Sequence, residues 1–148
     1  MAMKGGAKLE AYFKQAAARV SQPGTLEVGF PSGDTYANGV SIPMVAALNE
    51  YGVPSRNQPP RPFFRNMIAA DSPQWGKTMG TLLKAMDGDG HKVLTQMGEL
   101  IAGQLEKSIT EFTSPPLSPK TIARKGWSQP LVDSGVLKMS IKYKVTDE

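Results

Sequence analysis

The sequence lacks cysteine altogether and has a single histidine, His91, at the start of a long helical pattern. Without cysteine there is no disulfide framework, no thiolate nucleophile and no thiolate metal ligand. Metal centres built from nitrogen and oxygen need several His, Asp or Glu side chains at ligand spacing, and none cluster in this way. The run Asp87-Gly88-Asp89-Gly90 lacks the ligand spacing and closing glutamate of a calcium loop, so it is interpreted as a turn. We therefore expect neither a metal nor another cofactor.

Signatures of catalysis and of membrane insertion are absent too. No G-x-S-x-G nucleophile motif occurs, and no glycine-rich phosphate loop follows a strand pattern. No apolar run approaches the ~18 residues of a transmembrane helix, and Met1–Gly6 lacks the apolar core of a signal peptide. These absences predict a protein that is not an enzyme and that has no membrane partner. We expect a flexible arm over residues 1–6 and one domain over residues 7–148.

The excess of positive charge is also small, because 17 Lys and Arg residues are balanced by 13 Asp and Glu residues, for a net charge of +4. Nucleic-acid binding is permitted but not indicated, since the charges are spread rather than run together. Lys120, Arg124 and Lys125 form a small basic group, for which a solvated face is favoured over a contact with an acidic partner or phosphate. A small basic DNA-binding module that adds Lys142 and Lys144 to this group is an alternative from a different functional class.

Proline and glycine, in contrast, are abundant, with 12 and 15 copies, and indicate short elements joined by long ordered connections. The strongest pattern is His91–Phe112, where apolar residues recur every three or four positions. A helix of that length spans about 33 Å and is the natural core onto which a sheet packs. Further helices are expected over Ala7–Val20, Ile42–Tyr51, from Ser72-Pro73 to Met86 and from Ser118-Pro119 to Arg124, a helical turn before Ile141, and strands over Thr25–Phe30, Thr35–Val40 and Ile141–Val145.

The first of these helices has a narrow apolar stripe that consists of Leu9, Phe13, Ala16, Ala17 and Val20. Because the stripe is rich in alanine, it buries little area by itself and allows a close approach. We expect it to pack closely against another surface.

The chain is organised around a short helix and a proline-braced corner. Val45–Gly52 has helical spacing, Ser41 suits the N-cap, and Gly52 suits the left-handed residue that ends many helices. After a short loop comes Pro59-Pro60-Arg61-Pro62, which is stiff because proline fixes φ and pushes its neighbours to extended geometry. A second helix is expected to begin near Pro62, since the apolar residues that follow again have helical spacing.

The corner ends in two adjacent phenylalanines between two arginines, and two interpretations of them stay open. In the first, the aromatics are core residues and Arg61 pairs with a nearby acid such as Glu50. In the second, the corner or the loop Val53–Gln58 before it contacts another subunit, and the arginines of the corner make bidentate bonds to acids there. The candidate interface residues of the second interpretation are Tyr51, Pro60, Arg61, Pro62, Phe63, Phe64 and Arg65.

Two segments that lie apart in the sequence are informative when they are considered together. The first is V-A-x-x-N-E-Y-G, a loop and P-P-R-P-F-F-R, at Val45–Gly52 and Pro59–Arg65. The second is P-L-S-P-x-T-I-A-R-K-G, a gap and P-L-V-D-S-G-x-L-x-x-S-I, from Pro116 to Ile141. In this order they resemble the small head–tail joining and tail-completion proteins of long-tailed bacteriophages, the lambda-type neck family and its relatives. The matching segments cover about a third of the chain, and the family more usually has D-T-G where this sequence has Asp133-Ser134-Gly135.

The resemblance implies an α+β fold in which a long amphipathic helix packs on a small antiparallel sheet, here with additional short helices and ordered proline-rich loops. It implies a structural virion protein without enzyme activity, assembled in the host cytoplasm as a hexameric ring where the tail meets the head. The implied partners are further copies of itself, the head connector or adaptor, the tail tube or tail terminator, and DNA that passes through the channel without sequence-specific binding. A tail terminator or minor tail protein is the nearest alternative.

Overall fold

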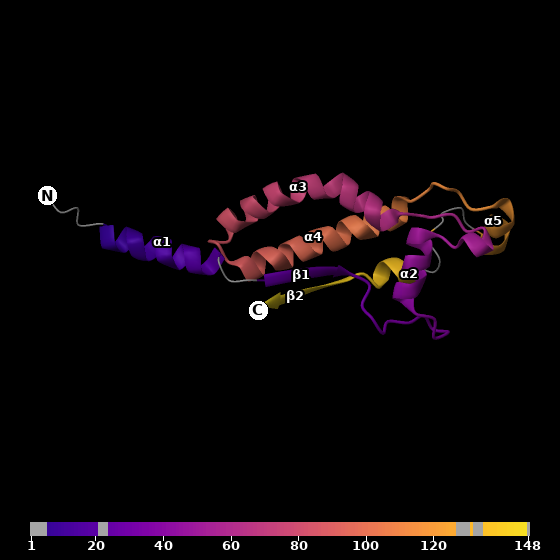
Figure 1. Cartoon of the computed structure of the whole chain (residues 1–148), viewed down its shortest axis with the longest axis horizontal. Helices are drawn as coiled ribbons and strands as arrows, with labels where there is room; N and C mark the ends of the chain where they lie inside the picture. The colour runs from indigo at the N-terminus through magenta and orange to yellow at the C-terminus, as the bar shows by residue number, and fades with distance from the viewer. Residues whose placement is uncertain (1–5, 21–23, 127–130, 132–134, 148) are drawn as a thin grey trace.

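The computed structural model describes residues 6–20, 24–126, 131 and 135–147. These residues form an α+β fold in which helices predominate and two strands pair as an antiparallel sheet (Figure 1), as the sequence predicts. Within the described ranges, no helix is both long and apolar enough to cross a membrane. The elements in chain order are α1 (Gly6–Val20), β1 (Gly24–Gly29), α2 (Ile42–Tyr51), the 3-10 helix η1 (Pro54–Arg56), α3 (Phe63–Ala85), α4 (Gly90–Glu111), α5 (Pro119–Lys125), α6 (Val136–Met139) and β2 (Lys142–Asp147).

The long helix α4 is the centre of the fold, with α3 on one side and the sheet on the other (Figure 1). Asp89 caps its start, because a carboxylate oxygen accepts a hydrogen bond of 3.1 Å from the backbone N–H of Lys92. Gly98 faces the sheet so closely that a Cβ there would lie 2.5 Å from Cδ2 of Tyr143. The absent side chain therefore lets α4 approach the sheet. The expected packing of a long helix on a small sheet is confirmed.

The sheet has one face on α4 and one face toward solvent. Leu26 of β1 lies opposite Val145 of β2, and both are half-buried. Glu27 lies opposite Lys144 on the other face, and both are exposed. The apolar and charged residues thus alternate along both strands as expected, because successive side chains of a strand point to opposite faces.

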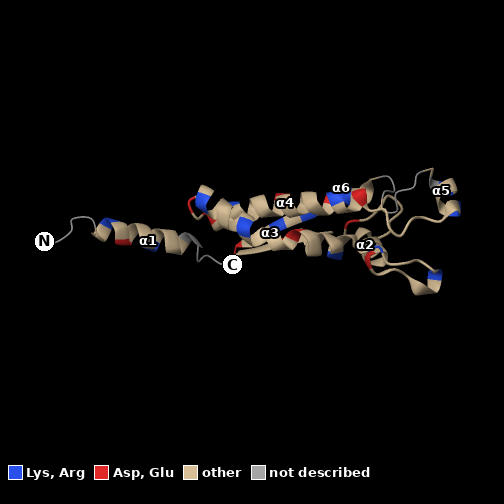
Figure 2. Cartoon of the chain, turned by 90° about the horizontal axis from the view of Figure 1, so that it is seen from above, with Lys and Arg blue, Asp and Glu red and all other residues tan. Residues whose placement is uncertain are grey.

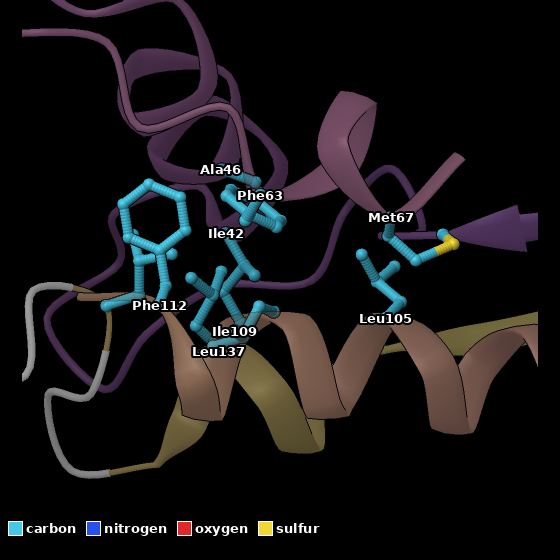
Figure 3. Packing of buried hydrophobic residues seen from close by; sticks show 9 residues of the cluster. Ile42, Ala46, Phe63, Met67, Leu105, Ile109, Phe112 and Leu137 are labelled. Carbon is cyan, nitrogen blue, oxygen red and sulfur yellow. The ribbon is translucent and has the colours of Figure 1, made fainter. Parts of the chain in front are cut away.

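The buried core lies at one end of the molecule, where α2, the start of α3, the end of α4 and α6 converge (Figures 1 and 3). Phe63 lies beside Ile42 and Ala46 in this cluster (Figure 3), and its ring meets that of Phe30 edge-on, with the centroids 6.3 Å apart. The backbone oxygen of Phe63 also accepts a hydrogen bond of 2.7 Å from Oγ of Ser108. The buried residues of the cluster are Ile42, Ala46, Phe63, Met67, Leu105, Ile109, Phe112, Leu131 and Leu137.

One long helix, α3, replaces the two helices that the sequence predicts on either side of Ser72-Pro73. It runs unbroken from Phe63 to Ala85 with Pro73 inside it, so the prediction of a break was wrong. An interior proline removes a backbone hydrogen bond and typically costs ~3 kcal/mol. Packing along α4 opposes that cost, and Nε1 of Trp75, just past the proline, donates a hydrogen bond of 2.9 Å to Oε1 of Gln104.

The strand predicted over Thr35–Val40 is not formed. Thr35 makes only an isolated bridge with Ser41, and the backbone between them turns back on itself. Tyr36 donates a backbone hydrogen bond of 2.9 Å to Val40, and Gly39 donates one of 2.9 Å to Tyr36. Gly39 has a φ of 81°, the left-handed conformation that glycine adopts readily, and this turns the segment out of extended geometry.

The N-terminal helix α1 forms as predicted, but its stripe is not buried. The side chains of Leu9 and Phe13 are more than half exposed, so the expected close packing is missing within the described part of the chain. The flexible arm expected over residues 1–6 lies outside the described residues, except for Gly6, with which α1 begins. Asp133 and Ser134 of the last matching segment also lie outside the described residues.

Candidate interaction surface

The α2–α3 corner, residues 51–65, is built from closed local turns. Gly52 has a φ of 74°, and a Cβ at this position would lie 2.7 Å from the backbone oxygen of Gln58, so only glycine fits. Val53 and Gln58 exchange two backbone hydrogen bonds of 2.9 and 3.1 Å across the loop. Asn57 takes the left-handed conformation that closes η1. The loop is therefore held by its own backbone as well as by its prolines.

Glu50 of α2 anchors the corner to the first turn of α3. Its side chain is buried, and its two carboxylate oxygens accept hydrogen bonds of 3.0 and 3.2 Å from the backbone N–H groups of Phe64 and Arg65. Those groups have no partner inside the helix, so a distant acid supplies the cap that Pro62 at the N-cap position lacks. The carboxylate also lies where the helix dipole favours negative charge.

Arg65 completes this arrangement within the same chain. Its Nε donates a hydrogen bond of 2.7 Å to Oε1 of Glu50, and Nη2 donates one of 3.1 Å to the backbone oxygen of Glu50. Its guanidinium carbon also lies 5.1 Å from the centroid of the exposed Tyr51 ring, a cation–π distance. The acid partner of Arg65 is thus internal, which differs from the expectation that both corner arginines bind acids on a neighbour.

Arg61 is buried rather than displayed. Its side chain keeps 8% of its accessible surface, and Nε has no hydrogen-bond partner among the described residues. Burial lowers the pKa of the guanidinium. The backbone N–H of Arg61 donates a hydrogen bond of 2.7 Å to the carbonyl of Asn49, which pins the chain against α2. The expected pairing of Arg61 with Glu50 is therefore wrong, because Arg65 occupies that carboxylate.

The two adjacent phenylalanines, whose roles the sequence left open, have different environments in the structure. Phe63 is 1% exposed and belongs to the core, as the first interpretation holds. Phe64 is half-buried at its edge, where it lines an apolar groove. Of the corner prolines, Pro60 is exposed and Pro62 is half-buried. The exposed part of the corner is thus smaller than the set of candidate residues.

The apolar groove has a volume of about 340 Å³ and runs between α2 and the start of α3. Next to the groove, α2 exposes an apolar row of Met44, Leu48 and Tyr51, of which Tyr51 also lines the groove. Their helical spacing was visible in the sequence, but spacing alone does not say whether a stripe faces the core or solvent. The described residues that line the groove are Phe30, Pro43, Ala46, Ala47, Glu50, Tyr51, Phe63, Phe64, Arg65 and Ile68.

The basic group lies on α5, at the end of the molecule far from α1 (Figure 2). Lys120 and Arg124 are exposed there, while the side chain of Lys125 lies outside the described part of the structure. Lysines, arginines and acids alternate along the rest of the molecule rather than gathering on one face (Figure 2). Lys142, for example, forms an ion pair of 2.8 Å with Asp34. The arrangement fits the solvated face favoured from the sequence.

Neither metal-binding side chains nor comparison with known proteins points to a further site. Across residues 6–20, 24–126, 131 and 135–147, no group of three or more His, Asp or Glu side chains lies close enough together to hold a metal ion. Comparison of the chain with protein-family models, curated proteins and solved structures found no match in any of the three. The surface that distinguishes this structure is the braced α2–α3 corner with its apolar groove.

Proposed function

We propose that this chain completes the tail of a long-tailed bacteriophage and joins it to the head connector, as one subunit of a hexameric ring around the DNA channel. The proposal starts from the sequence segments Val45–Gly52, Pro59–Arg65 and Pro116–Ile141, whose residues and order along the chain resemble the phage neck family. The same resemblance implies that the chain is a structural protein of the virion neck and not an enzyme.

The observation that carries the proposal is the construction of the α2–α3 corner. The loop is closed by its own hydrogen bonds, and Glu50 ties it to α3 through Arg65. Ordering a flexible loop on binding costs free energy, so a corner that is rigid beforehand suits a protein that must fit against neighbours. The exposed residues Tyr51 and Pro60 lie beside an apolar groove, and such surfaces mark sites of protein contact.

The proposed contact residues are accordingly fewer than the sequence alone suggests. Tyr51, Pro60, Phe64 and Arg65 reach the surface and form the contact. Phe63 supports them from the core, and Arg61 lies buried beneath the corner. Lys120 and Arg124 of α5 are a separate exposed patch, available to an acidic partner at the other face of a ring.

The first test is the mass of the purified protein by light scattering, alone and after addition of isolated phage tails that lack this subunit. We expect either a ring alone or tail-bound protein at a fixed multiple of the subunit mass, followed by attachment of heads. A monomer that ignores tails would contradict the proposal. Steeply salt-dependent binding to duplex DNA by that monomer would favour the basic DNA-binding module instead.

A matched pair of variants locates the contact. Met44 and Met139 are both exposed methionines, at 60% and 70%, but Met44 lies in the row beside the groove and Met139 lies on α6. We expect Met44→Ser to lower tail joining and Met139→Ser to leave it unchanged, with the helix content of both equal to that of the natural chain. Equal loss in the two variants, or no loss in either, would remove the apolar row beside the groove from the contact.

A further inference from the structure

The helix α1 exposes an apolar face that nothing in the described chain covers. Leu9, Tyr12 and Phe13 are 56%, 65% and 60% exposed, although they lie on one side of an amphipathic helix. The rings of Tyr12 and Phe13 pack edge-on with centroids 5.9 Å apart, which makes one compact aromatic knob. Figure 1 shows α1 extending past the end of the sheet and away from the body of the molecule.

The apolar groove lies at the opposite end of the sheet, beside α2 (Figure 1). The charged groups among its described lining residues are Glu50 and Arg65, which bind each other at 2.7 Å. A groove whose charges are already paired favours an apolar occupant over an ionic one, because an unpaired charge would lose hydration without compensation. The molecule therefore has an apolar projection at one end and an apolar recess at the other.

From this arrangement we infer that α1 of one copy docks its Leu9–Tyr12–Phe13 face into the apolar groove of a second copy. The two surfaces differ, so the contact is heterologous and repeats from copy to copy. If the rotation between copies closes, such a contact produces a ring. The inference deepens the proposed function, since it names one interface of the proposed ring and relies on self-assembly.

The available area sets the strength of a single contact. An aromatic side chain buries 150–250 Å², so two that are about 60% exposed offer on the order of 250 Å² together. A stable interface needs about 800 Å² from each partner. One docked α1 is thus weak by itself, whereas in a closed ring each copy makes two such contacts and none is left open. We expect association that rises steeply with protein concentration and has no stable dimer.

The lack of natural cysteine allows a direct test by disulfide cross-linking. One variant carries Ala17→Cys, about one turn beyond Phe13 on the same face of α1, so that Leu9, Tyr12 and Phe13 are kept. Another variant carries Ala47→Cys in the groove, and both alanines are exposed. After mixing and mild oxidation, we expect a covalent dimer of the two different variants at least tenfold above a control mixture of Ala17→Cys with Gly103→Cys. Gly103 is exposed on α4, has open space around it and does not line the groove, so its cysteine is accessible without being part of the docking site.

A second arm uses both cysteines in one chain. Docking between copies produces a ladder of covalent oligomers, and Phe13→Ser in the natural background weakens association about tenfold or more. Cross-linking no better than the control, or a disulfide-linked monomer from α1 folding back onto its own groove, would overturn the inference. Tail joining is measured separately. If tails are joined but no cross-links form, the inferred interface is wrong while the proposed function stands. If cross-links form but tails are not joined, the proposed function is wrong while the interface stands.

Discussion

Oε1 of Glu50, on α2, accepts a hydrogen bond of 2.7 Å from Nε of Arg65, on α3, across a sequence separation of 15 residues. The same carboxylate accepts hydrogen bonds from the backbone N–H groups of Phe64 and Arg65 in the first turn of α3, which have no partner inside the helix. One buried acid thereby caps a helix, pairs with an arginine and fixes the path of the loop between them. The position of Tyr51 and of the apolar groove depends on this arrangement, since both lie on the two elements that Glu50 joins.

Replacement of Glu50 tests whether this cap holds the corner. Glu50→Ala leaves two N–H groups of α3 and Nε of Arg65 without their acceptor, so we expect the free energy of unfolding to fall by about 2–4 kcal/mol. Glu50→Gln keeps the shape but loses the charge and should cost about half as much. Chemical denaturation measures both. The control is Glu10→Gln in the exposed pair with Lys14, where a change beyond about 0.5 kcal/mol is not expected. A loss from Glu50→Ala no larger than that of the control would contradict the role.

Gly98 and Gly103 form a matched pair on α4. Alanine at Gly98 places its Cβ 2.5 Å from Tyr143 and 3.0 Å from Leu26, so overpacking should destabilise the fold by about 1–3 kcal/mol despite better helix propensity. Gly103 has open space around it, and Gly103→Ala should stabilise by up to about 1 kcal/mol. Thermal unfolding of the two variants gives the sign of each change. Stabilisation by both substitutions would show that α4 does not approach the sheet closely at Gly98.

The ion pair between His91 and Asp147 makes stability depend on pH. Nδ1 of His91 lies 2.9 Å from the carboxylate, and this hydrogen bond, with the charges of Asp147 and Asp89, raises the pKa of the imidazole. A raised pKa in the folded state means that the stabilisation is fully present below the unfolded value of about 6.5 and is lost as pH rises through the folded value. We expect the Tm of the natural chain to exceed that of His91→Gln at pH 5.5, and the difference to vanish at alkaline pH. A difference that stays constant across this range would exclude the ion pair as its source.

Arg61 offers a test of a buried guanidinium whose Nε lacks a hydrogen-bond partner among the described residues. Arg61→Met keeps a long side chain and removes the guanidinium whose Nε has no hydrogen-bond partner in the described chain. We expect the free energy of unfolding to stay unchanged or to rise by about 1–3 kcal/mol. Arg65→Met is the comparison, because it removes the partner of a buried carboxylate and should lower stability by about 1–3 kcal/mol. A clear loss of stability in Arg61→Met would reveal a partner for the guanidinium.

The sequence by itself determined most of the local structure. Helical periodicity located α4. The capping residues Ser41 and Gly52 located the start and the end of α2. Alternation of apolar and charged residues located β1 and β2, although not the failure of the segment after Pro31 to form a strand. These features are predictable because caps, turns and periodic faces depend on residues within about one helical turn or one strand of each other.

Only the tertiary structure decided how those elements use their side chains. Contacts with α4 keep α3 helical through Pro73. Because α2 packs against α3, the carboxylate of Glu50 binds Arg65 rather than Arg61. The same approach buries Phe63 and leaves Phe64 at the groove, while the stripe of α1 stays exposed. Spacing along the chain shows which residues share a face, but burial and partner choice depend on which distant segment meets that face. For α1, we infer that this segment belongs to another copy of the chain.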